Sequence, residues 1–320
     1  MYYNRTISNN FANELKYGQF KWLIPYVKEH DDLDILTGKN DSIEFCSVYR
    51  GTSRIARIYK SVNGYSWLID AANPYMKICP ELFSVEGFNK DNLEYLRSHI
   101  ATQNQFNRYY NNHKEGYYQN LLQRKYGILA PPTSKLLIFD KEIVIGYSNQ
   151  SEKKQIYGIN QDRYQSVKIN LKASNPKSYG QPHNNQEILG NELDLMALDK
   201  EGYIHLMEIK HSSNPSGIYM SPFQIGLYKR LFDMIDIINA VKDLIIQKQD
   251  LGLLPHDWPI PTIQKQVIPE LIICEFKANS QCYPSKYNEV VKYIQNNASD
   301  IYKDVKDIVV RDEHLNHLCR

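Results

Sequence analysis

The alternation of apolar and polar positions is clearest between residues 190 and 228, where it predicts a β-hairpin followed by a helix. Residues 192–198 and 203–210 are apolar-rich runs, and the turn-forming sequence Asp-Lys-Glu-Gly separates them. Residues 221–250 then carry apolar side chains at helical spacing. This hairpin and its helix are the segment around which the rest of the chain is interpreted.

The hairpin is expected to gather charged side chains on a largely apolar surface. Side chains alternate between the two faces of a strand, so Glu192 and Asp194 share a face, and Glu208 and Lys210 share one on the second strand. Clustered carboxylates repel one another and resist desolvation unless a cation neutralises them. A hard divalent ion with oxygen ligands fits such a cluster, which favours Mg²⁺, with Mn²⁺ as the alternative.

The pattern along the whole chain predicts an α/β protein in two parts, residues 1–104 and residues 105–320. The first part reads as an α+β region with strands between residues 43 and 72. The elements expected in the second part are a helix at 103–126, a hairpin at 135–148, weak strands within 149–185, the core hairpin, a helix at 221–250, a strand at 267–276 and a helix at 287–297. The order of helices and strands favours a mixed sheet with helices packed against it.

Basic and aromatic residues interleave along the strands of the first part. Arg50, Arg54, Arg57 and Lys60 alternate with tyrosines, a composition that suits phosphate contacts and base stacking. The same residues would equally form the solvated face of a β-meander. Nucleic-acid binding or targeting is therefore one of two interpretations of residues 1–104.

The spacing of the charged residues in the hairpin resembles a known signature. Asp194 followed by Glu208-Ile209-Lys210 is similar to the core of the PD-(D/E)xK nuclease superfamily, with Leu193 where the family name has Pro. Downstream, Gln224 and Tyr228 form Q-x-x-x-Y, which resembles the motif of RecB-type nuclease domains. The resemblance implies a restriction-endonuclease-like core, a central mixed β-sheet flanked by helices, in residues 105–320.

The same resemblance implies roles for individual residues. Asp194 and Glu208 would hold the metal with the backbone carbonyl of Ile209, and Lys210 would help to activate the attacking water. Gln224 and Tyr228 would orient the substrate or the lysine. An acidic residue on a preceding helix often completes such a site, and the candidate here is Glu115, with Glu187 as its rival.

The same residues also allow purely structural interpretations. Glu208 and Lys210 could form an ordinary ion pair on an exposed strand, which stabilises little. Ser221, Pro222 and Gln224 match a helix start in which Gln224 closes a capping box. Tyr228 would then be a core residue one helical turn further along.

Composition narrows the class of protein. Hydrophobic residues make up 42% of the chain, enough for a packed core, and a net charge of +2 confines any nucleic-acid surface to a local patch. The 5 cysteines lack C-x-x-C spacing, which argues against a zinc site or a disulfide framework. No membrane-length apolar run or signal-peptide core is visible, so a cytoplasmic location is expected.

The sequence therefore predicts a Mg²⁺-dependent nuclease that hydrolyses phosphodiester bonds in DNA, with RNA and a homodimeric state left open. Richness in Tyr, Asn, Ile and Lys suggests an AT-rich bacterial genome, which fits a role in restriction, phage defence or repair. The main alternative is a catalytically inactive nucleic-acid-binding module with the same fold. A protein unrelated to nucleic acids, whose hairpin mimics the motif, is the third.

Overall fold

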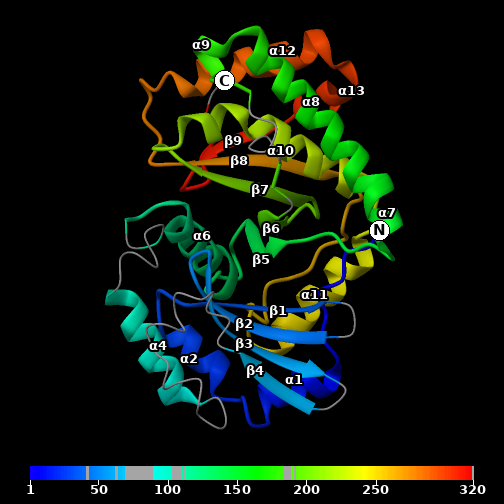
Figure 1. Cartoon of the computed structure of the whole chain (residues 1–320). Helices are drawn as coiled ribbons and strands as arrows, with labels where there is room; N and C mark the ends of the chain where they lie inside the picture. Colours follow the sequence, from blue (N-terminus) through cyan, green and yellow to red (C-terminus); the bar gives the residue numbers. More distant parts are fainter. Residues whose placement is uncertain are drawn as a thin grey trace. The chain divides into compact units, whose positions relative to one another are not determined.

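The computed structural model describes residues 1–40, 43–61, 64–68, 89–102, 110, 112–182, 189–190 and 192–318. These residues form a mixed α/β protein with two β-sheets (Figure 1). The chain divides into two compact units: unit 1 comprises Met1–Tyr3, Asp140–Asn239 and Pro261–Arg320, and unit 2 comprises Asn4–Phe139 and Ala240–Ile260. The boundary expected at residues 104/105 lies outside the described residues, and the observed units instead interleave along the chain.

Unit 2 is built on an antiparallel sheet whose strands follow chain order. These strands are β1 (Asp34–Asn40), β2 (Ile43–Arg50), β3 (Ser53–Ser61) and β4 (Gly64–Leu68). The last three were expected, whereas β1 lies in a segment expected to be a connection. The helical segments of this unit before β5 are α1 (Asn9–Lys16), α2 (Leu23–Glu29), α4 (Lys90–Thr102), α6 (Glu115–Gln123) and η2 (Arg124–Ile128). Within the described part of the helix expected at 103–126, residues 112–114 are not helical, and α6 begins at Glu115.

A buried apolar cluster holds unit 2 together. It joins α1 and α2 to the sheet through residues such as Phe11, Leu23 and Ile55, and it includes Leu251 and Leu253 from the second segment of the unit. Burial of apolar side chains of this size contributes about 1.5–3 kcal/mol each. The segment Ala240–Ile260 is thus part of this core although it is distant in sequence.

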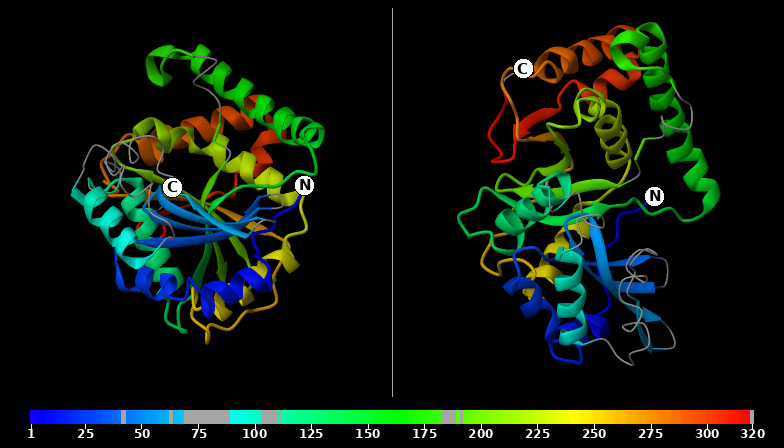
Figure 2. Two further views of the ribbon diagram at one scale, coloured as in Figure 1. Left: turned by 60° about the horizontal axis from the view of Figure 1, so that its bottom comes forward. Right: turned by 60° about the vertical axis from the view of Figure 1, so that its left-hand side comes forward.

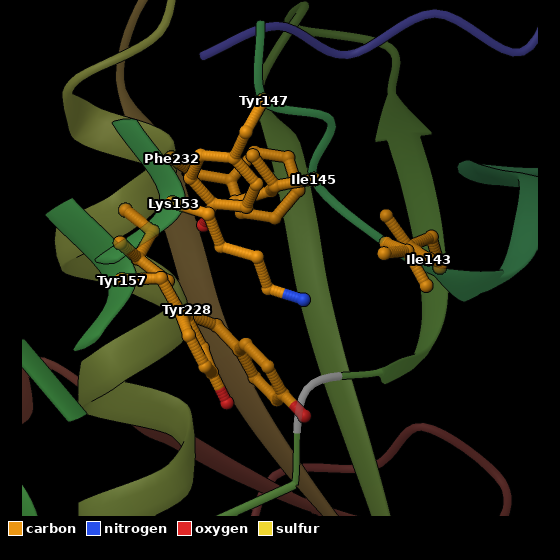
Figure 3. A pocket seen from close by; sticks show the side chains of 9 residues that line it. Ile143, Ile145, Tyr147, Lys153, Tyr157, Tyr228 and Phe232 are labelled. Atoms are coloured by element: carbon orange, nitrogen blue, oxygen red, sulfur yellow. The ribbon is translucent and has the colours of Figure 1, made fainter. Parts of the chain in front are cut away.

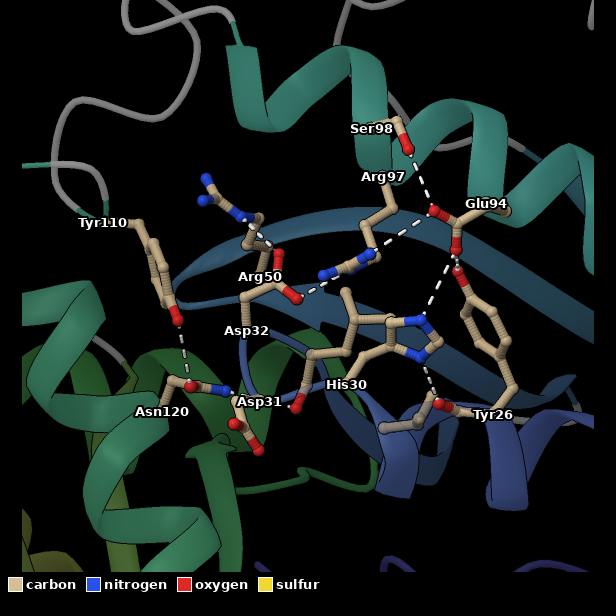
Figure 4. A network of polar contacts seen from close by, with 12 residues as sticks. Tyr26, His30, Asp31, Asp32, Arg50, Glu94, Arg97, Ser98, Tyr110 and Asn120 are labelled. Carbon is tan, nitrogen blue, oxygen red and sulfur yellow. Dashed lines mark hydrogen bonds and ion pairs between the residues drawn. The ribbon is translucent and has the colours of Figure 1, made fainter.

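Charged residues of unit 2 form hydrogen bonds and ion pairs with one another in a polar network (Figure 4). Asp32 accepts hydrogen bonds from the Nε atoms of Arg50, at 2.9 Å, and Arg97, at 2.7 Å. Glu94 accepts from the hydroxyl groups of Tyr26 and Ser98. Because Arg50 is 6% exposed and ion-paired, it does not fit the role of a surface phosphate contact.

Two further basic residues of these strands are also engaged within the unit. Arg57 donates to Ser47 Oγ and lies over the ring of Phe45, and Lys60 pairs with Glu44. These contacts favour the interpretation of an internally satisfied meander over a nucleic-acid surface.

The second sheet is mixed and five-stranded, in the order β5-β6-β7-β8-β9. It belongs to unit 1 except for residues 136–139 of β5, which are counted in unit 2. Its strands are β5 (Leu136–Ile143), β6 (Leu193–Asp199), β7 (Ile204–His211), β8 (Val267–Cys274) and β9 (Val309–Asp312). The β6–β7 pair is antiparallel, and the β7–β8 and β8–β9 pairs are parallel. The hairpin expected at 135–148 is wrong: Asp140 and Lys141, which suggested its turn, are buried residues within the single strand β5.

Helices cover a face of this sheet. Helix α10 (Pro215–Asp233) packs against β7 and β8, and α8 (Ile159–Ser174), α12 (Tyr287–Asn297) and α13 (Ser299–Val305) pack against α10 (Figures 1 and 2). Short segments complete the described helices of this unit: α7 (Gln150–Lys153), η3 (Lys154–Gly158), α9 (Pro176–Tyr179) and η5 (Cys282–Lys286). Helix α11 (Ile238–Asp250) belongs to unit 2 from Ala240 onward.

Two sequence-based expectations for these helices are wrong. The segment 163–172, expected to form weak strands, is part of α8, because Tyr164, Val167 and Leu171 are buried at helical spacing. The single helix expected at 221–250 is two helices, α10 and α11, separated at residues 234–237. None of the described helices is long and apolar enough to cross a bilayer.

Candidate active site

The β6–β7 hairpin brings the predicted acidic residues together. Leu195 pairs with Met207 across the two strands, so the antiparallel register continues to Asp194 opposite Glu208. Residues directly opposite one another in an antiparallel pair project on the same face. In addition, the Ile209 backbone N–H donates a hydrogen bond of 2.7 Å to Asp194 Oδ2, which fixes the aspartate against β7.

Glu208 and Lys210 form a buried ion pair rather than an exposed one. Glu208 is 1% exposed, and the Lys210 ammonium donates a hydrogen bond to Glu208 Oε1. All of β7 is covered except for a half-buried Lys210, because β7 lies between β6 and β8. The interpretation of an ordinary surface pair is therefore wrong. A buried charge requires compensation, and here Lys210 supplies it.

Asp194 is a strongly perturbed acid of the site. Burial raises the pKa of Asp194 well above its usual range, the Glu208 carboxylate raises it further, and Lys210 opposes them. Glu142 on β5 adds to the rise. Because burial and a neighbouring carboxylate both disfavour the ionised form of Asp194, a divalent cation at this position would favour its ionisation.

Glu142 is a participant that the sequence interpretation missed. It has a φ of 49°, a backbone conformation that residues other than glycine rarely adopt. Strained backbone of this kind is found where the surrounding structure fixes a side chain for a purpose. The signal available in the sequence is an Asp-Lys-Glu run directly after the apolar residues of a strand, but such a run is equally typical of a turn.

Gln224 and Tyr228 form a chain of hydrogen bonds that reaches the start of β6. Gln224 Nε2 donates to the Tyr228 hydroxyl at 3.1 Å, and that hydroxyl donates to the backbone carbonyl of Glu192. Glu192 lies two residues before Asp194, so this chain anchors the backbone that carries the aspartate. Burial, followed by the charge of Glu208, raises the pKa of Tyr228 well above its usual range.

The capping interpretation of Gln224 is wrong. Helix α10 begins at Pro215, and its N-cap is Asn214, whose side chain accepts from the Gly217 N–H at 3.0 Å. Ser221 and Pro222 lie inside the helix, and the Ser221 hydroxyl donates to the Ile218 carbonyl. Gln224 is thus an interior helix residue whose described hydrogen bond is to Tyr228.

A small pocket lies beside the ring of Tyr228 (Figure 3). Tyr147, Tyr157 and Phe232 line it together with the stem of Lys153, and its volume is about 30 Å³. The hydroxyl groups of Tyr157 and Tyr228 lie at the same end of the pocket in this view. A space of that size holds about one water molecule. The residues that line this pocket therefore pack against the ring of Tyr228, and the Tyr228 hydroxyl bonds instead to Gln224 and the Glu192 carbonyl.

The other predicted ligands have different outcomes. Glu115 is the first residue of α6 and belongs to unit 2, so it is not among the residues that unit 1 itself gathers around Asp194. Glu187 lies outside the described residues. Across the described ranges, no three His, Cys, Asp or Glu side chains are grouped closely enough to hold a metal ion. The described site thus offers a pair of carboxylates, with Ile209 beside them.

The fold and site define a mixed α/β protein whose central hairpin carries two carboxylates and a lysine, supported by a glutamine–tyrosine pair on the next helix. Comparison with protein-family models, with curated proteins and with solved structures finds no match for this chain. Its membership of the PD-(D/E)xK superfamily therefore stays a prediction from its own residues.

Proposed function

We propose that the protein is a Mg²⁺-dependent nuclease that hydrolyses phosphodiester bonds in DNA, built on a restriction-endonuclease-like core in unit 1. The observation that carries the proposal is the convergence of Asp194, Glu208 and Lys210 on adjacent strands. A mixed sheet with a helix packed on it directly after the E-x-K strand agrees with such a core.

The donor set fits a hard cation. Asp194 and Glu208 offer carboxylate oxygens. Burial first, and the charge of Glu208 second, raise the pKa of Asp194, and a divalent ion would offset both effects. When bound, Mg²⁺ supplies a polarised phosphoryl oxygen and a water of lowered pKa. With two carboxylates from the described residues, the remaining ligands would be the Ile209 carbonyl, water and the substrate.

The residues of the chain then have separate tasks. Lys210 hydrogen-bonds the attacking water. Its positive charge, beside the reacting phosphate, offsets the negative charge that develops in the transition state. Tyr228 and Gln224 hold the backbone before Asp194 through the Glu192 carbonyl. The cover over β7 keeps bulk water from the Glu208 side chain, which is 1% exposed.

Two observations favour the alternative, a nucleic-acid-binding module without turnover. The described residues do not gather a third acidic ligand, and Lys210 is bonded to Glu208 rather than directed only at a substrate. A module of this kind would bind DNA and leave it intact.

The test incubates the purified full-length protein with linear, circular and single-stranded DNA in Mg²⁺, in Mn²⁺ and in chelator. We expect cleavage that needs the metal and is lost in Glu208→Gln. Glu201→Gln, the same change at an exposed position in the hairpin turn, is the matched control and should cut normally. A folded protein that binds these DNAs but cuts none would favour the alternative, and one that does neither would exclude both.

A further inference from the structure

A cleft of about 330 Å³ lies between the middle of α8 and the start of α10. Among the described residues that line it are Lys168 and Lys172 of α8, Lys210 of β7, and the polar side chains of Asn214, Ser216 and Gln224. No aspartate or glutamate is found among the lining residues that the structure describes. The cleft therefore brings two lysines of α8 beside Lys210, whose charge is paired with Glu208, in a protein whose net charge is only +2.

Lys168 and Lys172 are presented by the helical repeat of α8. They lie one turn apart, and each directly follows a buried residue, Val167 and Leu171 respectively. Both lysines are half-buried. Long lysine stems pack along apolar surface while the ammonium group stays at the polar end. The two charges are thus held on the cleft side of α8 by the packing of that helix.

The cleft shares two lining residues with the candidate active site. Lys210 lines the cleft and also bonds Glu208, and Gln224 lines it and bonds the Tyr228 hydroxyl. A strand that places one phosphate beside Lys210 would therefore have a neighbouring phosphate at this cleft. A volume of this size is in the range of pockets that hold small ligands or single groups of a larger one.

We propose that this cleft binds the phosphate next to the one that is cut, with Lys168 and Lys172 as its binding residues. The inference rests on the proposed function and adds a subsite to it. Phosphate contacts from lysine fix the register of a nucleic acid without reading its sequence. The first turn of α10, which carries no acidic residue, faces the same cleft and adds a favourable partial charge. The subsite would therefore hold the strand in register while Asp194, Glu208 and Lys210 act on the adjoining bond.

The test compares two double variants that remove the same charge. Lys168→Gln with Lys172→Gln removes the α8 charges from the cleft, and Lys292→Gln with Lys303→Gln removes two exposed lysines from α12 and α13. Binding of a short DNA duplex with a single-stranded extension is measured in chelator at several salt concentrations. The cleft variant should bind at least tenfold more weakly near 0.1 M salt, about 1.4 kcal/mol. Its plot of log affinity against log salt should flatten by about 0.7–0.9 for each phosphate that the protein no longer neutralises.

The control should change affinity less than about twofold, which is the expectation for distant exposed charges. Equal weakening in both variants, or a cleft variant that binds with the wild-type salt slope, would overturn the subsite. Lys168→Arg with Lys172→Arg keeps the charge and should restore binding, which separates a charge effect from a folding defect. A wild-type protein that neither binds nor cuts DNA would instead overturn the proposed function. One that binds and cuts, while the cleft variant binds equally well, would overturn the subsite alone.

Discussion

Replacing Tyr228 with phenylalanine removes a single hydroxyl group that connects helix α10 to the start of β6. Tyr228 is 3% exposed, and its hydroxyl accepts from Gln224 and donates to the Glu192 carbonyl. Each net hydrogen bond contributes about 0.5–1.5 kcal/mol, so we expect Tyr228→Phe to lower the free energy of unfolding by about 1–3 kcal/mol. Because the hydroxyl also anchors the backbone before Asp194, the rate of DNA cleavage should fall at least tenfold, which is about 1.4 kcal/mol of activation free energy.

Tyr164→Phe is a matched control for this change. Tyr164 is 0% exposed, and its hydroxyl donates at 2.6 Å to Asp304 Oδ2 and lies 3.1 Å from the Gly226 carbonyl. It is also a buried tyrosine of unit 1 with two hydroxyl contacts, but those contacts lie outside the cluster around Asp194. We therefore expect a similar loss of stability with cleavage near the wild-type rate.

The assay pairs chemical unfolding with single-turnover cleavage at saturating Mg²⁺, at a temperature where all three proteins are folded. Tyr164→Phe should lower the free energy of unfolding but leave the cleavage rate near that of wild type. Tyr228→Phe should lower both. If Tyr228→Phe cuts at the wild-type rate, the tyrosine is a packing residue and its link to Asp194 has no role in turnover. If both variants lose activity in proportion to stability, the anchoring argument is equally wrong.

Two further variants test the charges of the cluster. Lys210→Ala should lower single-turnover cleavage at least about a hundredfold while DNA affinity in chelator changes less than tenfold, because a charge beside the reacting bond acts mainly on the transition state; equal losses of both would make Lys210 a plain phosphate contact. Asp194→Asn should raise the melting temperature in chelator at pH 8 by about 2–4 °C, or roughly 1 kcal/mol, and leave it unchanged below pH 4. The reason is that folding raises the pKa of the Asp194 carboxyl group, so the wild-type protein becomes less stable as the pH rises from the unfolded-state pKa of this group towards its folded-state pKa. A variant less stable than wild type at pH 8 would show that the ionised carboxylate is not destabilising.

The amino-acid sequence is sufficient to predict the central hairpin because its signals are local and consistent. The turn 199–202 separates two apolar runs, so the hairpin itself and the shared face of Glu208 and Lys210 can be worked out from the pattern. The register that sets Asp194 opposite Glu208, in which Leu198 pairs with Ile204, comes from the structure. The strand β8 and the helix α12 are likewise predicted from single uninterrupted patterns.

Prediction fails where one stretch supports two patterns. In α8, Val167, Ile169 and Leu171 alternate as in a strand, whereas Tyr164, Val167 and Leu171 have helical spacing, and only tertiary packing selects the second. Helix α10 has two start signals, Asn214-Pro215 and Ser221-Pro222, and the earlier one is the true start. The role of Glu142 depends on an unusual φ value and on pairing between distant strands, neither of which a local pattern contains.

The interleaving of the two units has a consequence for the order in which the chain folds as it is synthesised. The apolar core of unit 2 begins near the N-terminus with Phe11 and Leu23, but it also requires Leu251 and Leu253. A ribosome must therefore complete β6, β7 and α10 of unit 1 before the last residues of the earlier core emerge. Domains ordinarily fold in sequence from the N-terminus during translation. Here the core of unit 2 stays incomplete, with part of its apolar surface uncovered, until the strands that carry Asp194 and Glu208 have already been synthesised.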